Sequence, residues 1–276
     1  MTVEQRVAEH YTQGGLAGTI LGALRAMGKD PERLAPADLA PVDEFHIGGR
    51  QATIDFAAQM GIRPGMRLLD IGSGLGGAAR YFAGEHGCSV TGIDLTDEYV
   101  QVASDLARRA GLDGSVSYRQ GSALDLPFDA ASFDGAYMLH VGMNIEDKAR
   151  LFAGVRRVLK PGGLLGVYDV MRTGAGDFSF PVPWAATAAT SFVETPTDYR
   201  QRLEAAGFAV QKERGRRDFA LAFFQQMRAR AAQSGGPPPL GLHILMGADF
   251  AQKTANMIDN LQRGLIEPTE IVSQAA

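Results

Sequence analysis

The sequence has a single cysteine, Cys88, which excludes a disulfide within the chain. It also lacks a long apolar run. The stretch 178–193 has no charged residue, but it contains Pro181 and Pro183 and is predicted to be a loop, not a membrane span. Residues 1–10 carry charged side chains and no apolar stretch, unlike a signal peptide. These absences predict a cytoplasmic protein without a membrane span.

Positive charge is also scarce, because 27 Lys and Arg face 31 Asp and Glu, for a net charge of −4. Such a balance does not favour a phosphate backbone, so no nucleic-acid partner is expected. No group of His and Cys has metal-ligand spacing, and no metal site is predicted. What the chain does have is 45% hydrophobic residues over 276 positions, enough for a packed core.

The chain divides into an appendage and a core. Residues 1–60 show apolar residues at helical spacing and are predicted to form an N-terminal helical appendage or lid. Residues 61–276 are predicted to form the core, with two insertions that cover the substrate, at about 171–197 and 217–264. The run Gly235–Pro239 is predicted to interrupt the second insertion as a hinge or rigid loop.

From residue 66 onward, short apolar strands alternate with helices. This alternation favours an α/β fold, in which a parallel sheet is covered by helices on both faces. Helices are predicted between the strands, including one that begins at Asn144 and ends near Leu159. The predicted strands are 67–71, 89–93, 116–119, 133–139, 164–170 and 208–212, with a closing strand at 270–272.

The most informative segment is a glycine-rich loop between the first strand and the next helix. Gly72, Gly74 and Gly77 allow a sharp turn and a close approach of the backbone to a ligand, and the helix start offers free N–H groups. Asp94 ends the second strand, 20 residues after Gly74, where a carboxylate can accept hydrogen bonds from ribose hydroxyls. This geometry suits NAD and S-adenosylmethionine equally well.

Two features favour S-adenosylmethionine over NAD. Asp70 lies two residues before the first glycine, where its carboxylate can face the ammonium of a methionine moiety but would repel a pyrophosphate. No Tyr-x-x-x-Lys pair, which is common at hydride-transfer sites, is present. A NAD-binding oxidoreductase and a non-catalytic cofactor sensor stay open as alternatives of other classes.

Several motifs together resemble class I S-adenosylmethionine-dependent methyltransferases. Within this group, the Gly76-Gly77-Ala78-Ala79-Arg80 variant is similar to sarcosine/dimethylglycine, sterol and tocopherol methyltransferases. The resemblance covers about residues 45–210 and implies a Rossmann-like fold. The motifs are Leu68–Phe82, Gly92-Ile93-Asp94, Ala123–Phe128, Ser132-Phe133-Asp134 and Leu159–Gly163.

The resemblance implies a set of cofactor-binding residues. Many relatives have Asp at the position of Ser122, so that contact departs from the family pattern. Arg50 either reaches the cofactor carboxylate or is a surface charge. By position, Gly72, Ser73 and Gly74 would line the methionine part, Asp94 the ribose, Leu95, Ser122 and Ala123 the adenine, and Leu139 the cofactor at the end of the fourth strand.

Two histidines are candidates for a catalytic base or substrate anchor. His140 follows the fourth strand at the carboxyl edge, where open α/β sheets bind ligands; the alternative is a structural hydrogen bond to Asn144. His46 lies in a segment similar to one near the site of amine-methylating relatives; the alternative is a turn residue. Tyr11, Met143 and Trp184 are predicted substrate-pocket walls, although such residues often belong to a core.

The predicted function is methyl transfer from S-adenosylmethionine to a nitrogen or oxygen of a small metabolite by direct displacement. Carbon methylation of a lipid-like or aromatic acceptor is the alternative, and a homodimer is a further prediction.

Overall fold

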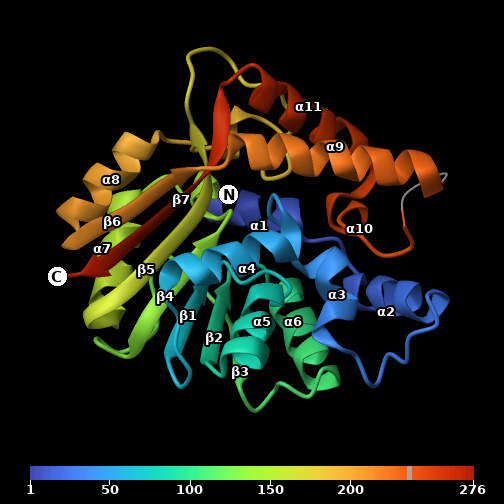
Figure 1. The fold of residues 1–276 in the computed structure, drawn as a ribbon, viewed down its shortest axis with the longest axis horizontal. Helices are drawn as coiled ribbons and strands as arrows, with labels where there is room; N and C mark the ends of the chain where they lie inside the picture. The colour runs from blue at the N-terminus through green and yellow to red at the C-terminus, as the bar shows by residue number, and fades with distance from the viewer. Residues whose placement is uncertain (235–237) are drawn as a thin grey trace.

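The computed structural model describes residues 1–234 and 238–276, which fold around one seven-stranded sheet (Figure 1). The strand order is β3-β2-β1-β4-β5-β7-β6. The pairs among β1 to β5 are parallel, whereas β7 is antiparallel to both of its neighbours. The strands are β1 Arg67–Ile71, β2 Ser89–Asp94, β3 Val116–Gln120, β4 Phe133–Leu139, β5 Leu159–Arg172, β6 Phe208–Gly215 and β7 Ile266–Ala275.

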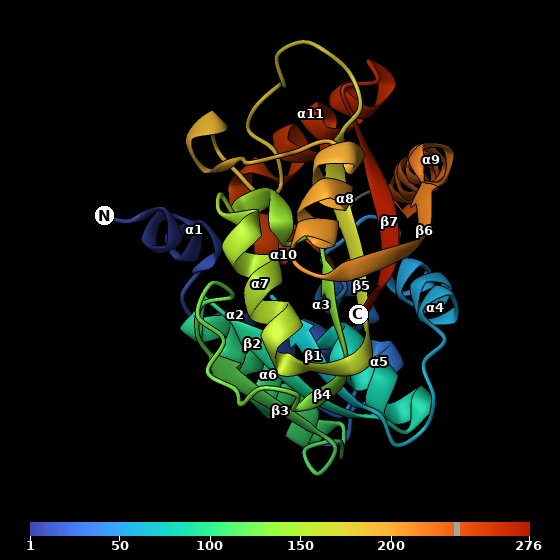
Figure 2. The same ribbon diagram turned by 90° about the vertical axis from the view of Figure 1, so that its left-hand side faces the viewer.

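The central strands are apolar throughout because both faces of the sheet are covered. In β1, Leu68 belongs to the core beneath one set of helices and Leu69 and Ile71 to the core beneath the other. Figure 2 shows the two layers on either side of the sheet. One layer holds α4 (Gly49–Met60), α5 (Gly77–His86) and α6 (Asp97–Arg109), and the other holds α7 (Lys148–Val158) and α8 (Pro196–Ala205).

The closing strand is real but longer than predicted, and it corrects the expectation of a parallel sheet. The chain comes back from α11 (Phe250–Gln262) at the carboxyl ends of the parallel strands and enters the sheet from that edge. Strand β7 therefore runs against β5 and separates it from β6. The α/β, Rossmann-like architecture itself is confirmed.

The helix predicted from Asn144 begins later. Asn144 ends a short 3₁₀ turn, Gly142–Asn144, and α7 starts at Lys148. The side chain of Asp147 accepts a hydrogen bond from Arg150 N, which satisfies a free donor of the first turn and sets the helix start there.

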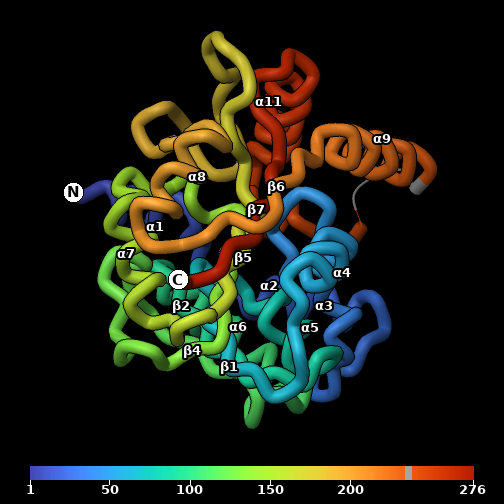
Figure 3. The backbone as a smooth tube through the Cα atoms, turned by 60° about the vertical axis from the view of Figure 1, so that its left-hand side comes forward, coloured from blue at the N-terminus to red at the C-terminus, as the bar shows by residue number. Residues whose placement is uncertain are grey.

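The remaining helices gather at the carboxyl ends of the parallel strands (Figures 1 and 3). Pro36 begins α3 (Pro36–Asp43), since proline lacks only an N–H that the first turn leaves unused. Of the predicted interruption at Gly235–Pro239, residues 235–237 lie outside the described residues. The helices are α1 Val3–Tyr11, α2 Leu16–Ala26, α3 Pro36–Asp43, α9 Arg217–Ser234, α10 His243–Met246 and α11.

Within the described residues, no helix combines the length and apolar character needed to cross a membrane.

Candidate active site

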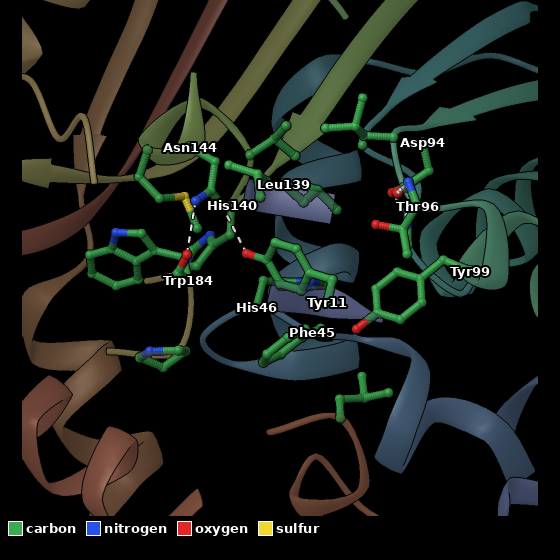
Figure 4. A pocket seen from close by; sticks show the side chains of 18 of the residues that line it. Tyr11, Phe45, His46, Asp94, Thr96, Tyr99, Leu139, His140, Asn144 and Trp184 are labelled. Atoms are coloured by element: carbon green, nitrogen blue, oxygen red, sulfur yellow. Dashed lines mark hydrogen bonds between the residues drawn. The ribbon is translucent and has the colours of Figure 1, made fainter. Parts of the chain in front are cut away.

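A cavity of about 290 Å³ lies between the carboxyl edge of the sheet and the helices that gather there. Figure 4 shows Asp94, Thr96 and Tyr99 on one side of it and Trp184, His140 and Asn144 on the other. The predicted site residues that line the cavity are Tyr11, His46, Gly72, Gly74, Asp94, Leu95, Ala123, Leu139, His140, Met143 and Trp184. Four predicted residues, Arg50, Asp70, Ser73 and Ser122, do not line it.

The glycine-rich loop is held open by hydrogen bonds to the second strand. Gly72 N and Ser73 N both donate to Ile93 O, at 2.8 and 3.1 Å. Gly72 has a φ of +70°, and a Cβ there would come within 2.5 Å of the Val141 side chain, so only glycine fits. No atom lies within 4 Å of the Cβ position of Gly74, which faces the cavity.

Asp94 joins this loop to the next helix and still faces the cavity. Its Oδ2 accepts from Gly74 N at 2.8 Å and its Oδ1 from Thr96 N at 2.9 Å. Each carboxylate oxygen has a second lone pair, so the group can also accept hydrogen bonds from ligand hydroxyls. The arrangement fits the ribose of an adenosyl cofactor, as predicted.

Buried polar atoms without a hydrogen-bond partner lie near the same loop. Among the described residues these include Asp70 Oδ2, Ser73 Oγ and Arg50 Nη2. Burial raises the pKa of the Asp70 carboxyl to about 8. Arg50, Asp70 and Ser73 do not line the cavity, so the fit of an adenosyl cofactor there rests on Gly72, Gly74 and Asp94, which do.

Arg50 has a different partner from the predicted cofactor carboxylate. Its Nε lies 2.5 Å from Glu44 Oε1, and its guanidinium stacks over the Tyr81 ring with 5.2 Å to the centroid. Glu44 in turn accepts a hydrogen bond from Thr53 Oγ1 at 2.7 Å. Arg50 is half-buried, so the surface-charge alternative does not describe it either.

Ser122 does not line the cavity but bonds Glu4, a lining residue that the sequence analysis did not predict. Its hydroxyl donates to Glu4 Oε1 on α1, and Glu4 lines the cavity. Ser122 is thus linked to a carboxylate of the N-terminal helix. No local signal could have identified Glu4, because the two residues are 118 positions apart in the chain.

His140 lies at the cavity wall with both ring nitrogens engaged. Nδ1 lies 3.2 Å from Tyr168 O, and Nε2 accepts from Ile47 N at 3.4 Å. Because the carbonyl can only accept, Nδ1 carries the proton. Burial lowers the pKa of His140 to about 3, so the ring is neutral. Its predicted bond to Asn144 is absent from the hydrogen bonds found.

His46 packs near His140, with 6.0 Å between the ring centroids. The Thr53 hydroxyl gives its proton to Glu44, so it accepts from His46 Nε2, at 3.1 Å. Burial lowers the pKa of His46 to about 4, so this ring is neutral too. A hydrogen bond to the backbone of Gly49 opposes this lowering of the pKa.

Asn144 connects three segments that close the cavity. Its Oδ1 accepts from the Tyr11 hydroxyl of α1 at 2.8 Å. Its Nδ2 donates to Trp184 O at 2.8 Å (Figure 4). The same Nδ2 donates to Thr190 O at 3.1 Å. The sequence placed Asn144 only as a structural partner of His140. Its position one turn after the end of β4 is the signal that could have marked it as a site residue.

Among the described residues, no group of three or more His, Cys, Asp and Glu side chains is arranged to hold a metal ion.

Part of the chain matches known methyltransferases. Residues 69–167 match the model of a methyltransferase domain. Sterol 24-C-methyltransferase ERG6B of Gibberella zeae is 37% identical over 117 residues, which cover 42% of this chain and 31% of that protein. The chain thus spans about a third of the length of this relative.

Two solved structures share the fold over nearly the whole chain. Phosphoethanolamine N-methyltransferase 2 of Haemonchus contortus, in complex with S-adenosyl-L-methionine, has a TM-score of 0.76 at 18% identity and covers 98% of this chain and 60% of that one. Geranyl diphosphate C-methyltransferase from Streptomyces coelicolor A3(2), solved with Mg²⁺, geranyl diphosphate and S-adenosyl-L-homocysteine, has a TM-score of 0.73 at 18% identity and covers 100% and 98%. Identities this low show a common fold, the Rossmann-like fold of class I methyltransferases.

Proposed function

We propose that this chain, in which residues 69–167 form a methyltransferase domain, transfers a methyl group from S-adenosylmethionine to a small-molecule acceptor held in the cavity. The observation that carries the proposal is the Asp94 carboxylate, which is fixed by Gly74 N and Thr96 N and faces the same cavity as the glycine-rich loop.

When bound, S-adenosylmethionine supplies an electrophilic methyl group, whose carbon–sulfur bond breaks with its electron pair left on sulfur while a lone pair or π bond of the acceptor forms the new bond. The chain contributes position and exclusion of water. Asp94 and Gly74 lie on one side of the cavity, where they would orient the cofactor. Tyr11, Asn144 and Trp184 close the other through their hydrogen bonds.

Residues 1–60, 171–197 and 217–264 act as covers in this proposal. Tyr11 of α1, Trp184 of the second segment and Phe224 of α9 all line the cavity, which supports that role. The shielding matters because water competes with the acceptor for space behind the methyl group.

The acceptor atom and the base are finer points of the proposal. Nitrogen or oxygen remains the predicted atom, with carbon as the alternative. A base is needed only for a nucleophile that is protonated in solution. Of the two histidines, His46 bonds through Nε2 to Thr53, and His140 uses both of its ring nitrogens in hydrogen bonds. A cytoplasmic location, a homodimer and the absence of a nucleic-acid partner remain predictions.

Calorimetric titration tests the proposal. We expect S-adenosylmethionine and S-adenosylhomocysteine to bind at micromolar concentrations and NADH not to bind. Binding of NADH alone would replace the proposal with an oxidoreductase. Binding of none of the three to folded protein would leave only the fold established.

A further inference from the structure

The side of the cavity opposite Asp94 is formed by three helices that supply almost only apolar side chains. We name this surface the C-terminal wall: Phe223, Phe224 and Met227 of α9, Met246 of α10, and Phe250 and Met257 of α11. Thr254 is the one polar side chain that these helices add to the lining, within the part of the chain that the structure describes. A strongly polar ligand would gain little binding free energy from such a surface.

The polar side chains beside the C-terminal wall are already engaged with the protein. Asn144 uses both amide hydrogens on carbonyl oxygens and accepts from Tyr11. His10 Nε2 lies 2.9 Å from Pro183 O. Apart from these bonds, the buried Tyr99 hydroxyl lines the cavity without a hydrogen-bond partner among the described residues, so it can bind the head group of an acceptor.

The cavity offers no partner for an anionic acceptor. No Lys or Arg is found among its lining residues in the described chain. The buried lysine on α11, Lys253, points its Nζ at Met246 O, at 3.1 Å, and does not line the cavity. His46 and His140 line it but are neutral. A phosphate placed here would be desolvated without compensation.

The lining differs for a cationic acceptor, because it holds five carboxylates and, within the described chain, no Lys or Arg. Asp43 forms an ion pair with buried Arg80 at 2.6 Å. Glu4 and Asp94 accept hydrogen bonds from uncharged donors, which do not neutralise them. The remaining two lining carboxylates belong to exposed residues, Glu146 and Asp147. An ammonium in the cavity would therefore find carboxylates as well as the aromatic rings of the C-terminal wall.

We propose that the acceptor is a molecule without negative charge that has an extended hydrocarbon skeleton, whose apolar part lies against the C-terminal wall. This inference rests on the proposed function for the identity of the reaction, but it concerns the binding of the acceptor and is testable without turnover.

The test compares three probes that share a ten-carbon tail and differ in head charge: 1-decanol, decyl phosphate and decylamine. Each is titrated by calorimetry into full-length protein saturated with S-adenosylhomocysteine. We expect 1-decanol and decylamine each to bind at least about tenfold more tightly than decyl phosphate, a difference of about 1.4 kcal/mol. Binding of decyl phosphate equal to or tighter than that of either other probe overturns the proposal, and so does binding of none of the three.

The position of the probe is checked through Trp184, the single tryptophan of the chain. It is buried and lines the cavity. We expect 10-bromo-1-decanol to quench its fluorescence with the same affinity that calorimetry gives for 1-decanol. Binding without quenching would place the tail elsewhere and overturn the proposal.

A matched pair of variants tests the C-terminal wall itself. Met227→Lys puts a cation on the wall, and Gln226→Lys puts the same charge on the exposed face of the same helix. We expect Met227→Lys to weaken 1-decanol binding at least about fivefold and to strengthen decyl phosphate binding, with Gln226→Lys within twofold of the parent. Equal effects of the two variants contradict the proposal. Titration of S-adenosylhomocysteine alone measures cofactor binding. A variant or parent that does not bind the cofactor contradicts the proposed function, whereas one that binds the cofactor but not 1-decanol contradicts only the role of the C-terminal wall.

Discussion

The carboxylate of Asp94 binds the backbone of two loops and can also bind a ligand. Two backbone N–H groups, from Gly74 and Thr96, orient it. The position was predictable because the end of the second strand in a Rossmann-like fold meets the glycine-rich loop at the same edge of the sheet. The register of Ile71 opposite Ile93 brings the two together.

Replacement of Asp94 by alanine is expected to weaken cofactor binding with the fold retained. Loss of charge-assisted hydrogen bonds of about 1.5–3 kcal/mol predicts a fall of about 10- to 100-fold in affinity for S-adenosylhomocysteine, measured by calorimetry. Asp113→Ala, at an exposed carboxylate after α6, serves as the control. Unchanged affinity in Asp94→Ala would remove the cofactor assignment.

His140 is unusual in its backbone as well as its ring, because its φ is +58°. Alanine is strained in that conformation and asparagine tolerates it. We expect both His140→Ala and His140→Asn to lower turnover more than cofactor affinity. Steady-state kinetics beside calorimetry measures the split. Turnover equal to the parent in His140→Asn would assign the ring to holding Ile47 and Tyr168.

At the scale of elements, α1 covers the cavity, and one carboxylate of α6 binds the backbone that follows it. Glu98 accepts from the backbone N–H groups of Gln13, Gly14 and Leu16, at 2.8, 2.9 and 3.0 Å. These three donors lie between α1 and α2. The helix that follows Asp94 in the chain therefore also anchors the cover that carries Glu4 and Tyr11.

Loss of the Glu98 side chain is expected to loosen α1. In Glu98→Ala, amide hydrogen exchange in residues 3–16 should accelerate at least about tenfold, since three charge-assisted bonds are lost. Asp97→Ala removes the neighbouring carboxylate, which bonds only Gln101 among the described residues, and should leave exchange unchanged. Equal exchange in the two variants would show that other contacts hold α1.

The elements themselves were largely predictable, with two instructive exceptions. The helix expected from Asn144 starts at Lys148 because Asp147 supplies the N-cap. The strand expected at 270–272 extends over Ile266–Ala275 because a strand between two others is stabilised along its whole length by ladder hydrogen bonds. Apolar periodicity detects the centre of an element, and its ends depend on side-chain caps and neighbours.

For the whole molecule, the buried Asp70 carboxyl links stability to pH. Its pKa is raised to about 8 in the folded chain, from an ordinary value near 4. Between these values the folded chain holds a proton that the unfolded chain has released. The free energy of unfolding therefore decreases as pH rises from about 4 to about 8.

Replacement of Asp70 by asparagine should remove this decline. We expect the melting temperature of Asp70→Asn, without cofactor, to exceed that of the parent at pH 8 by more than it does at pH 5. Thermal unfolding at both pH values measures the effect, with Asp113→Asn as the exposed control. Parallel pH profiles for Asp70→Asn and the parent would contradict the burial of an unpaired carboxyl.

The sequence by itself determined the cofactor half of the cavity. Gly72, Gly74 and Asp94 belong to short motifs at the ends of consecutive strands, and the local backbone geometry of a strand, a tight turn and a helix start brings them to one edge. Only the tertiary structure decided the acceptor half. Glu4, Asn144 and Phe224 come from segments far apart in the chain, and they meet because the terminal helices pack over the same edge of the sheet. Such contacts follow from the burial of apolar surface. Because this burial is non-directional, it produces no motif with a fixed spacing in the sequence.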